Sequence, residues 1–293
     1  MLSAFKLMAL ATAALAPIAI SALAPGYGTG PATPHVPLPE FVELRPGTIQ
    51  FRASGEFLGG GKPIVAPIVA VTVDRSLAVM KSQVTVADYQ RCVKAGACPV
   101  AGSGETASNR PVVGVSWRDT QAYISWLSRE TGTRFRLPTD EEWAYAAASR
   151  FHDDALPESL DRSDPGQRAL AIYDRDASRV MAAGKAPQPI GSFGANENGL
   201  LDMAGNVWEW TDTCFQRITL DAAGATTAAV ANCGVRVVEG LHRAYMTDFV
   251  RDARAGGCVS GTPPSNLGFR LVRDDVSWPG LSLALGLVRP AAR

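Results

Sequence analysis

The stretch from Gly194 to Trp210, with the sequence GANENGLLDMAGNVWEW, constrains the fold of this chain more than any other segment. Gly199 and Gly205 allow the backbone to adopt positive φ at no steric cost. Trp208 and Trp210 lie two residues apart, so in an extended segment both side chains point to the same face and can be buried together. The pattern predicts a glycine-bent turn followed by a strand with two core tryptophans.

Oxygen atoms recur through the same stretch at the spacings i, i+3, i+5 and i+7, from two carboxylates and two main-chain carbonyls. Such a series is typical of a site for a hard cation such as Ca²⁺. In the simpler interpretation the acids are solvated and hold no ion, and the residue types alone leave both interpretations open. The four residues of the series are Asp202, Gly205, Val207 and Glu209.

The composition indicates a well-packed globular protein with no electrostatic preference for nucleic acid. The 293 residues are 46% hydrophobic and 19% charged, and 28 basic residues balance 28 acidic ones. A chain of this length forms one large domain or two ordinary ones. The charge balance and the absence of a basic cluster exclude a nucleic-acid partner of the usual kind.

The first 24 residues are typical of an export signal. Lys6 is followed by an uncharged run rich in Ala and Leu that ends at Ala24, and this run resembles the apolar region of a signal peptide. Cleavage would release a periplasmic protein, whereas an uncleaved segment would anchor the chain in the membrane. Residues 25–47 are rich in proline and predict an extended linker. Residues 276–293 form a C-terminal tail whose apolar run is too short to span a bilayer.

Five cysteines in an exported chain predict disulfides, because the compartment outside the cytoplasm is oxidising. Cys92 and Cys98 bracket a predicted helix end and are close enough in sequence to form a short bridge. Cys214 and Cys233 flank a segment of small residues and are expected to join its ends. Cys258 is left over, and the sequence does not fix the pairing. A zinc site is the weaker alternative, because the chain has no CxxC pair and only three scattered histidines.

Regular secondary structure is predicted to be modest. Thr85 with Asp88, and Thr139 with Glu142, have the spacing of capping boxes at helix starts. Residues 151–190 lack a sustained period and are expected to be irregular apart from a short helix near 167–173. The remaining predictions are helices at 85–95, at 118–131 and after Thr139, and strands at 49–51, 64–73, 77–80, 111–117, 235–238 and 268–274.

Three blocks together resemble the formylglycine-generating enzyme, or sulfatase-modifying factor, family. They are PVVGVSWRDTQAYISWLSRETGTRFRLPTDEEWAYAA, NENGLLDMAGNVWEW and NLGFRLV, and they occur in the family's order. The resemblance covers residues 48–275. It implies a single α+β domain of the formylglycine-generating-enzyme (C-type-lectin-like) type, rich in loops. By position it also implies that Asp202, Gly205, Val207 and Glu209 form a structural calcium site.

The family's copper chemistry is not implied. The segment LHRAYMTDFVRDAR, residues 241–254, has Leu241 and Met246 where the family has its two copper-binding cysteines. Leucine cannot bind a metal, and a lone methionine is a poor substitute for thiolates. We therefore do not expect bound copper. His242, Arg243, Tyr245 and Arg254 resemble the family's residues. The candidate catalytic residues are His242, Tyr245 and Arg254, and Cys258 downstream is a further candidate for a reactive thiol.

The export signal and the EGLHRAYM variant at 239–246 are most similar to NirV-type proteins, which are associated with bacterial nitrite reductases. This implies an accessory protein whose partner is a periplasmic reductase or a peptide segment of it. The pyoverdine-maturation branch of the family is the alternative. It implies an oxidoreductase that acts on a peptide or small molecule through the same cleft.

Overall fold

The computed structural model describes residues 36–152, 164–183, 186–255 and 266–274. All of them belong to one compact unit, Pro34–Arg293. The α-helices in this part are α1 (Val86–Lys94), α2 (Trp117–Thr131), α3 (Asp140–Ala147) and α4 (Pro165–Ala183), and two short 3₁₀ turns are η1 (Ala148–Arg150) and η2 (Ala253–Ala255). The strands are β1 (Phe41–Leu44), β2 (Gly47–Arg52), β3 (Glu56–Gly59), β4 (Lys62–Ile64), β5 (Ile68–Val73), β6 (Leu77–Met80), β7 (Phe135–Arg136), β8 (Trp208–Leu220), β9 (Thr226–Glu239), β10 (Ala244–Thr247), β11 (Leu267–Gly268) and β12 (Val272–Arg273).

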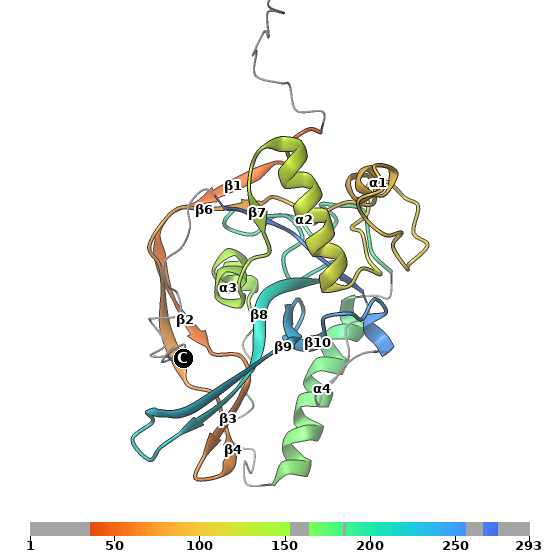
Figure 1. Ribbon diagram of the computed structural model, residues 1–293. Coiled ribbons are helices and arrows are strands. Elements are labelled where there is room, and N and C mark those ends of the chain that lie inside the picture. Colours follow the sequence, from red (N-terminus) through yellow and green to blue (C-terminus); the bar gives the residue numbers. More distant parts are fainter. Residues whose placement is uncertain (1–35, 153–163, 184–185, 256–265, 275–293) are drawn as a thin grey trace, which may run out of the picture. The chain divides into compact units, whose positions relative to one another are not determined.

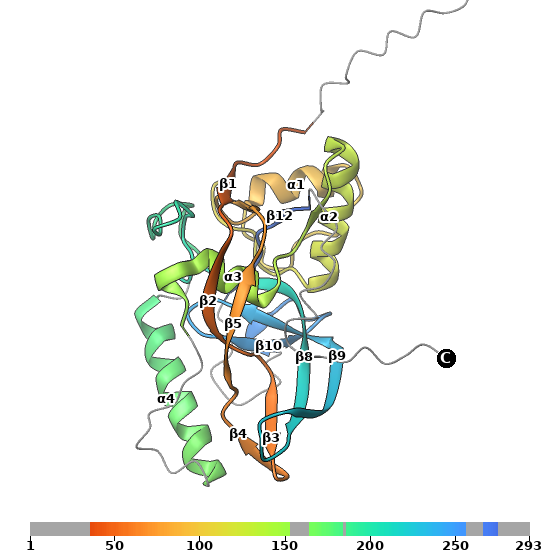
Figure 2. The same ribbon diagram turned by 90° about the vertical axis from the view of Figure 1, so that its left-hand side faces the viewer.

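The strands form three sheets (Figures 1 and 2). One sheet has the order β1-β6-β12-β7, and a two-stranded ribbon pairs β2 with β5. The third has the order β10-β9-β8-β3-β4, with β11 pairing in parallel to the start of β8. This mixture of helices and short and long strands confirms the predicted α+β class.

Three of the helices begin with a capping box. Thr85, Ser116 and Thr139 each accept a hydrogen bond from the backbone N–H three residues on, and the acid at that position accepts one from the cap's own N–H. Reciprocal bonds of this kind satisfy donors that a helix start otherwise leaves unpaired. Helix α2 ends at Gly132, whose φ of 68° is the left-handed conformation that favours glycine. The boundaries predicted for α1 and α2 and the start predicted for α3 are confirmed to within one residue.

The start of strand β8, which contains Trp208 and Trp210, lies in the hydrophobic core. Trp208 and Trp210 are 2% and 0% exposed, and both indole N–H groups donate to main-chain carbonyls, of His242 and Val115 respectively. Buried tryptophans usually find such an acceptor. The prediction that both side chains are buried together is confirmed.

Several sequence predictions differ from the structure. Residues 111–117 form no strand beyond one isolated bridge at Pro111, and the predicted strand at 268–274 is reduced to the two-residue strands β11 and β12. Helix α4 occupies much of the region predicted to be irregular. The helix was missed in the sequence because it has no long apolar run. The predicted linker, residues 25–47, overlaps β1 and the start of β2, because its prolines lie outside the paired residues Phe41–Leu44.

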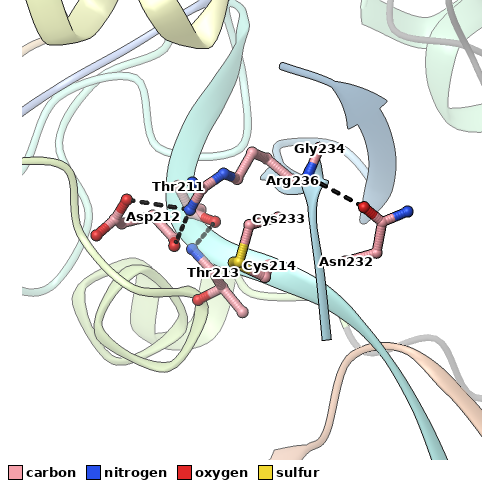
Figure 3. Close-up of a disulfide and its surroundings, with 8 residues drawn as sticks. All are labelled: Thr211, Asp212, Thr213, Cys214, Asn232, Cys233, Gly234 and Arg236. Carbon is pink, nitrogen blue, oxygen red and sulfur yellow. Dashed lines mark hydrogen bonds and ion pairs between the residues drawn. A yellow bond between two sulfur atoms is a disulfide. The ribbon is translucent and has the colours of Figure 1, made fainter. Parts of the chain in front are cut away.

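The segment between Cys214 and Cys233 belongs to a long β-hairpin. Strands β8 and β9 pair along most of their length, and the disulfide joins them with a Cα–Cα distance of 4.5 Å (Figure 3). Beside it, Arg236 donates to the Asp212 carbonyl at 2.7 Å. The second disulfide joins Cys92 and Cys98 in the core, with residues 0% and 8% exposed.

Both predicted disulfide pairs are thus present. Two disulfides indicate a protein of an oxidising, extracellular-type compartment. In the described part of the chain, no helix combines the length and apolarity needed to cross a bilayer.

Candidate functional site

The centre of the molecule is a buried carboxylate, Glu209 of β8, which is 0% exposed. Its Oε1 accepts from the side-chain amide Nε2 of Gln83 at 2.7 Å and from Arg270 Nη2 at 2.7 Å. Its Oε2 accepts from Trp143 Nε1 at 2.8 Å and from Arg270 Nε at 2.6 Å. Four donors from three separate segments therefore surround one carboxylate, and the buried Arg270 guanidinium neutralises its charge.

Asp202 is the second buried acid of this stretch. The backbone φ of Asp202 is 57°, in the left-handed region. Its carboxylate accepts hydrogen bonds from the backbone N–H groups of Gly191 at 2.6 Å and Phe193 at 2.8 Å. The side chain therefore holds the preceding loop in place. Gly205 is required nearby, because a Cβ there would lie 2.8 Å from the Phe193 ring.

These contacts bear on the calcium site expected at Asp202, Gly205, Val207 and Glu209. A carboxylate has about four acceptor positions, and the four donors to Glu209 fill them. A Ca²⁺ ion bound by this carboxylate would also lie against the guanidinium of Arg270. The Glu209 side chain does not fit a calcium ion in this arrangement. The calcium site implied by the family resemblance is untested, and these contacts argue against it.

A second buried charge cluster lies where β9 ends and α3 begins. The Arg243 guanidinium Nε lies 2.7 Å from Glu239 Oε1 and 3.4 Å from Asp140 Oδ2, and the three side chains are almost entirely buried. Within the described chain, the Asp140 carboxylate accepts no hydrogen bond. Burial and the adjacent Asp140 raise the pKa of Glu141 to about 7. The carboxylates of Glu239, Asp140 and Glu141 therefore lie together near the Arg243 guanidinium.

His242 belongs to the same loop and is 1% exposed. Its ring packs edge-on against Trp208 with centroids 5.1 Å apart. Its Nδ1 lies 3.0 Å from the Arg243 carbonyl and 3.8 Å from Asp176 Oδ2. Asp176 is buried on α4 and also accepts from Arg175 at 2.8 Å. Asp176 was not predicted as a site residue, because it lies in the region expected to be irregular.

A cleft of about 530 Å³ lies apart from these buried groups. Two arginines of its lining are paired with acids: Arg251 donates two hydrogen bonds to Asp119, and Arg254 pairs with Asp252 at 3.0 Å. Gly114 has a φ of 74°, and a Cβ there would lie 2.4 Å from the Ser103 nitrogen, so this wall requires glycine. The lining segments are 102–105, 113–114, 186–187, 251–254 and 266–267.

The model of the sulfatase-modifying factor enzyme 1-like domain matches residues 28–275. The chain belongs to this family. The three sequence blocks of the family converge in space, since Trp143, Glu209 and Arg270 come from one block each and meet at the buried carboxylate.

Relatives in the family include active and inactive proteins. A formylglycine-generating enzyme of Streptomyces coelicolor is 32% identical over 178 residues, which are 57% of this chain and 53% of that protein. A protein of Bos taurus named inactive C-alpha-formylglycine-generating enzyme 2 is 32% identical over 168 residues, 55% of this chain and 49% of its own length. The chain spans about half the length of the curated relatives it matches.

Among solved structures, PvdO from Pseudomonas aeruginosa superimposes with a TM-score of 0.51 at 22% sequence identity. The match covers 80% of this chain and 94% of that chain. At this identity the similarity shows the fold alone.

The structure separates the residues that the sequence analysis grouped as catalytic. Arg254 lines the cleft, whereas His242 is buried against Trp208 and Asp176. The Tyr245 hydroxyl accepts from the Gly55 N–H at 2.7 Å, and its ring packs against Phe215. Cys258 lies outside the described residues. Only Arg254 of the described candidates therefore lines the cleft.

The two positions that correspond to the family's copper-binding cysteines are part of the core. Met246 is 0% exposed on β10, and Leu241 packs against the same hydrophobic cluster. Leucine offers no ligand, and a thioether enclosed by apolar side chains serves as packing. The residues present at these positions do not fit a copper ion.

Proposed function

We propose that this chain is an exported accessory protein that assists the maturation of a periplasmic reductase and does not itself generate formylglycine. The observation that carries the proposal is the pair Leu241 and Met246, which replaces two cysteines by core side chains on an otherwise complete family scaffold. A scaffold that retains its buried centre and its cleft but lacks the oxidising group is suited to binding a client.

Three further observations support the proposal. The two disulfides agree with an exported protein. The EGLHRAYM variant at 239–246 resembles NirV-type proteins, which points to a nitrite reductase as the client. The Bos taurus relative is named inactive, so the name supports a role for the scaffold without the oxidation.

The alternative is an oxidoreductase that acts on a peptide or small molecule through the same cleft, as in the pyoverdine-maturation branch. The cleft lined by Arg254 supports it. The burial of His242 and the hydrogen bond to Tyr245 favour the accessory role, because neither side chain lies among the residues that line this cleft.

Complementation of a deletion strain tests the proposal, with reductase activity in periplasmic extracts as the readout. We expect deletion to lower this activity and the Met246→Leu and Cys258→Ser variants to restore it fully, because neither residue supplies chemistry in an accessory role. Arg254→Ala, which changes the cleft, is expected to complement poorly.

Two outcomes contradict the proposal. Full reductase activity in the deletion strain removes the accessory role. Failure of Cys258→Ser at normal protein abundance favours the oxidoreductase, because it assigns chemistry to a thiol.

A further inference from the structure

The hairpin of β8 and β9 forms an arm with β3 and β4, and no strand of the described residues covers one edge of this arm (Figures 1 and 2). Strand β10 pairs with β9 only between Val235 and Val238. Every residue of β9 from Thr226 to Gly234 is exposed. Within the described chain, no strand pairs with the outer side of β9 between Thr226 and Cys233. The backbone groups that point away from β8 there are available to another strand.

The two edges of the arm differ in their protection. The β4 edge is three residues long and includes Lys62 and Pro63, a charge and a residue without an N–H. The β9 edge has the sequence TTAAVANC, with no charge and no proline. Proteins usually protect sheet edges with charges, prolines or short strands. The β4 edge follows this practice and the β9 edge does not, so the β9 edge is suited to strand addition.

The β9 edge is also held in an extended shape. Residues Phe215 to Thr219 of β8 pair in continuous register with Asn232 to Ala228 of β9. The Cys214–Cys233 disulfide fixes the inner end of this run (Figure 3). A strand that is already held in the extended conformation loses less conformational entropy when a partner strand binds.

We propose that the β9 edge between Thr226 and Cys233 binds an extended segment of the client protein as an additional strand. The inference rests on the proposed function for the existence of a client. Main-chain hydrogen bonds provide the affinity in this mode of recognition, and side-chain pockets provide the specificity. Three of the eight side chains are alanines, so the pockets are shallow. The segment bound is therefore uncharged, free of proline and rich in β-branched residues.

A second copy of this chain fits the edge less well. A stable protein interface takes about 20 to 30 residues a side. The open edge offers the eight residues from 226 to 233, six of which are Ala, Thr or Val. Such a contact suits a transient peptide rather than a stable dimer.

Binding is tested with the full chain and a capped octapeptide of alternating Thr and Val. We expect the peptide to slow hydrogen exchange at the β9 amides that point away from β8 and to leave the cleft unaffected. A second peptide carries N-methyl groups on two successive central amides, which removes a donor from either edge, and we expect it not to bind. No binding of the first peptide, or protection elsewhere, overturns the inference. Protection that depends on protein concentration alone, without peptide, assigns the edge to a second copy and also overturns it.

The variant for this test is Ala229→Lys with Ala231→Lys, two exposed positions on β9. Lysine protects natural edges, so we expect binding of the octapeptide to weaken by about tenfold or more. The matched control is Ala70→Lys with Thr72→Lys, two exposed positions on β5, and it should bind normally. Equal binding by the two double variants contradicts the edge as the site.

The same variants in the deletion strain separate this inference from the proposed function. If the chain is required for reductase activity but the β9 lysine variant complements fully, the edge inference fails and the accessory role stands. If the chain is not required, the proposed function fails, whereas binding of the octapeptide still tests the edge.

Discussion

Two buried glutamate–arginine pairs lie at opposite positions of β8 and β9, where Glu209 and Glu239 are register partners. Glu209 binds Arg270 through two hydrogen bonds, and two further donors complete its carboxylate. Glu239 accepts a hydrogen bond from Arg243 Nε at 2.7 Å, and that arginine also lies beside Asp140. The first pair is fully hydrogen-bonded, whereas the second belongs to a cluster that also contains the carboxylates of Asp140 and Glu141.

The first pair belongs to the scaffold that the family shares, and the second includes a residue of the segment in which this chain departs from the family. The Glu209 centre joins the three family blocks and identifies the fold. Arg243, the partner of Glu239, lies in segment 241–254. This segment departs from the family at Leu241 and Met246. Buried charges are stabilised by complete hydrogen bonding. We therefore expect the stability contributed by the first pair to change mainly on mutation, and the stability contributed by the second cluster to change also with pH.

The largest expected effect comes from Arg270→Met. Removing one partner of a buried ion pair typically costs about 3–5 kcal/mol, because the other charge is left uncompensated. Urea unfolding followed by tryptophan fluorescence measures the loss. The control is Arg273→Met, whose pair with Glu43 is partly exposed and contributes about 1 kcal/mol or less. Similar losses in the two variants would show that the Glu209 centre is not the scaffold's main ion pair.

Met246→Ala tests whether segment 241–254 is core. Truncating a buried methionine costs about 2–5 kcal/mol, whereas Met246→Leu conserves volume and costs about 1.5 kcal/mol or less. The same unfolding assay applies. A neutral Met246→Ala would mean that this side chain does not pack as described and is available as a ligand.

Glu141→Gln tests the pH response of the second cluster. The pKa of Glu141 rises from 4.5 to about 7 on folding, so between these values the folded chain binds more protons than the unfolded chain. Stability contributed by this group therefore falls as pH rises through that window. We expect the variant to raise the melting temperature by on the order of a few degrees at pH 8 and to leave it unchanged near pH 4.

The control for this pH response is Glu130→Gln, at an exposed position of α2. It should not change the melting temperature at either pH. Equal melting of Glu141→Gln and the unmodified chain at pH 8 would refute the raised pKa of this carboxylate.

The smallest expected effect is that of a chelator. Ligands that bind only the native state raise its melting temperature, so removal of a structural calcium ion would lower it. The donors around Glu209 satisfy its carboxylate without an ion, and we expect excess chelator to change the melting temperature by less than about one degree. A fall of several degrees, reversed by Ca²⁺, would support the site implied by the family resemblance.

Local signals in the sequence predicted much of the fold. The capping boxes at Thr85 and Thr139 and the stop at Gly132 identified three helices, because each is decided within a few residues. The burial of Trp208 and Trp210 followed from their spacing.

The candidate site was less predictable, because its partners are distant in sequence. Asp176 reaches His242 only through the placement of α4, and Arg270 reaches Glu209 across 61 residues. Family blocks contained a usable signal, since Trp143 and Arg270 lie within them, but no spacing in one chain reveals which blocks meet. The length of β9 was also missed, because small residues such as Ala228 and Ala229 give a weak strand pattern.

The position of Arg270 near the end of the described chain has a consequence for biosynthesis. Strand β12, which follows it, pairs with β6 and β7 from the first half of the chain. The buried centre therefore forms only after residue 270 has been synthesised. Segments synthesised earlier cannot complete their packing before that point. Contacts so distant in sequence slow folding. In a chain exported as proposed, this delay keeps most of the polypeptide unfolded while it crosses the membrane.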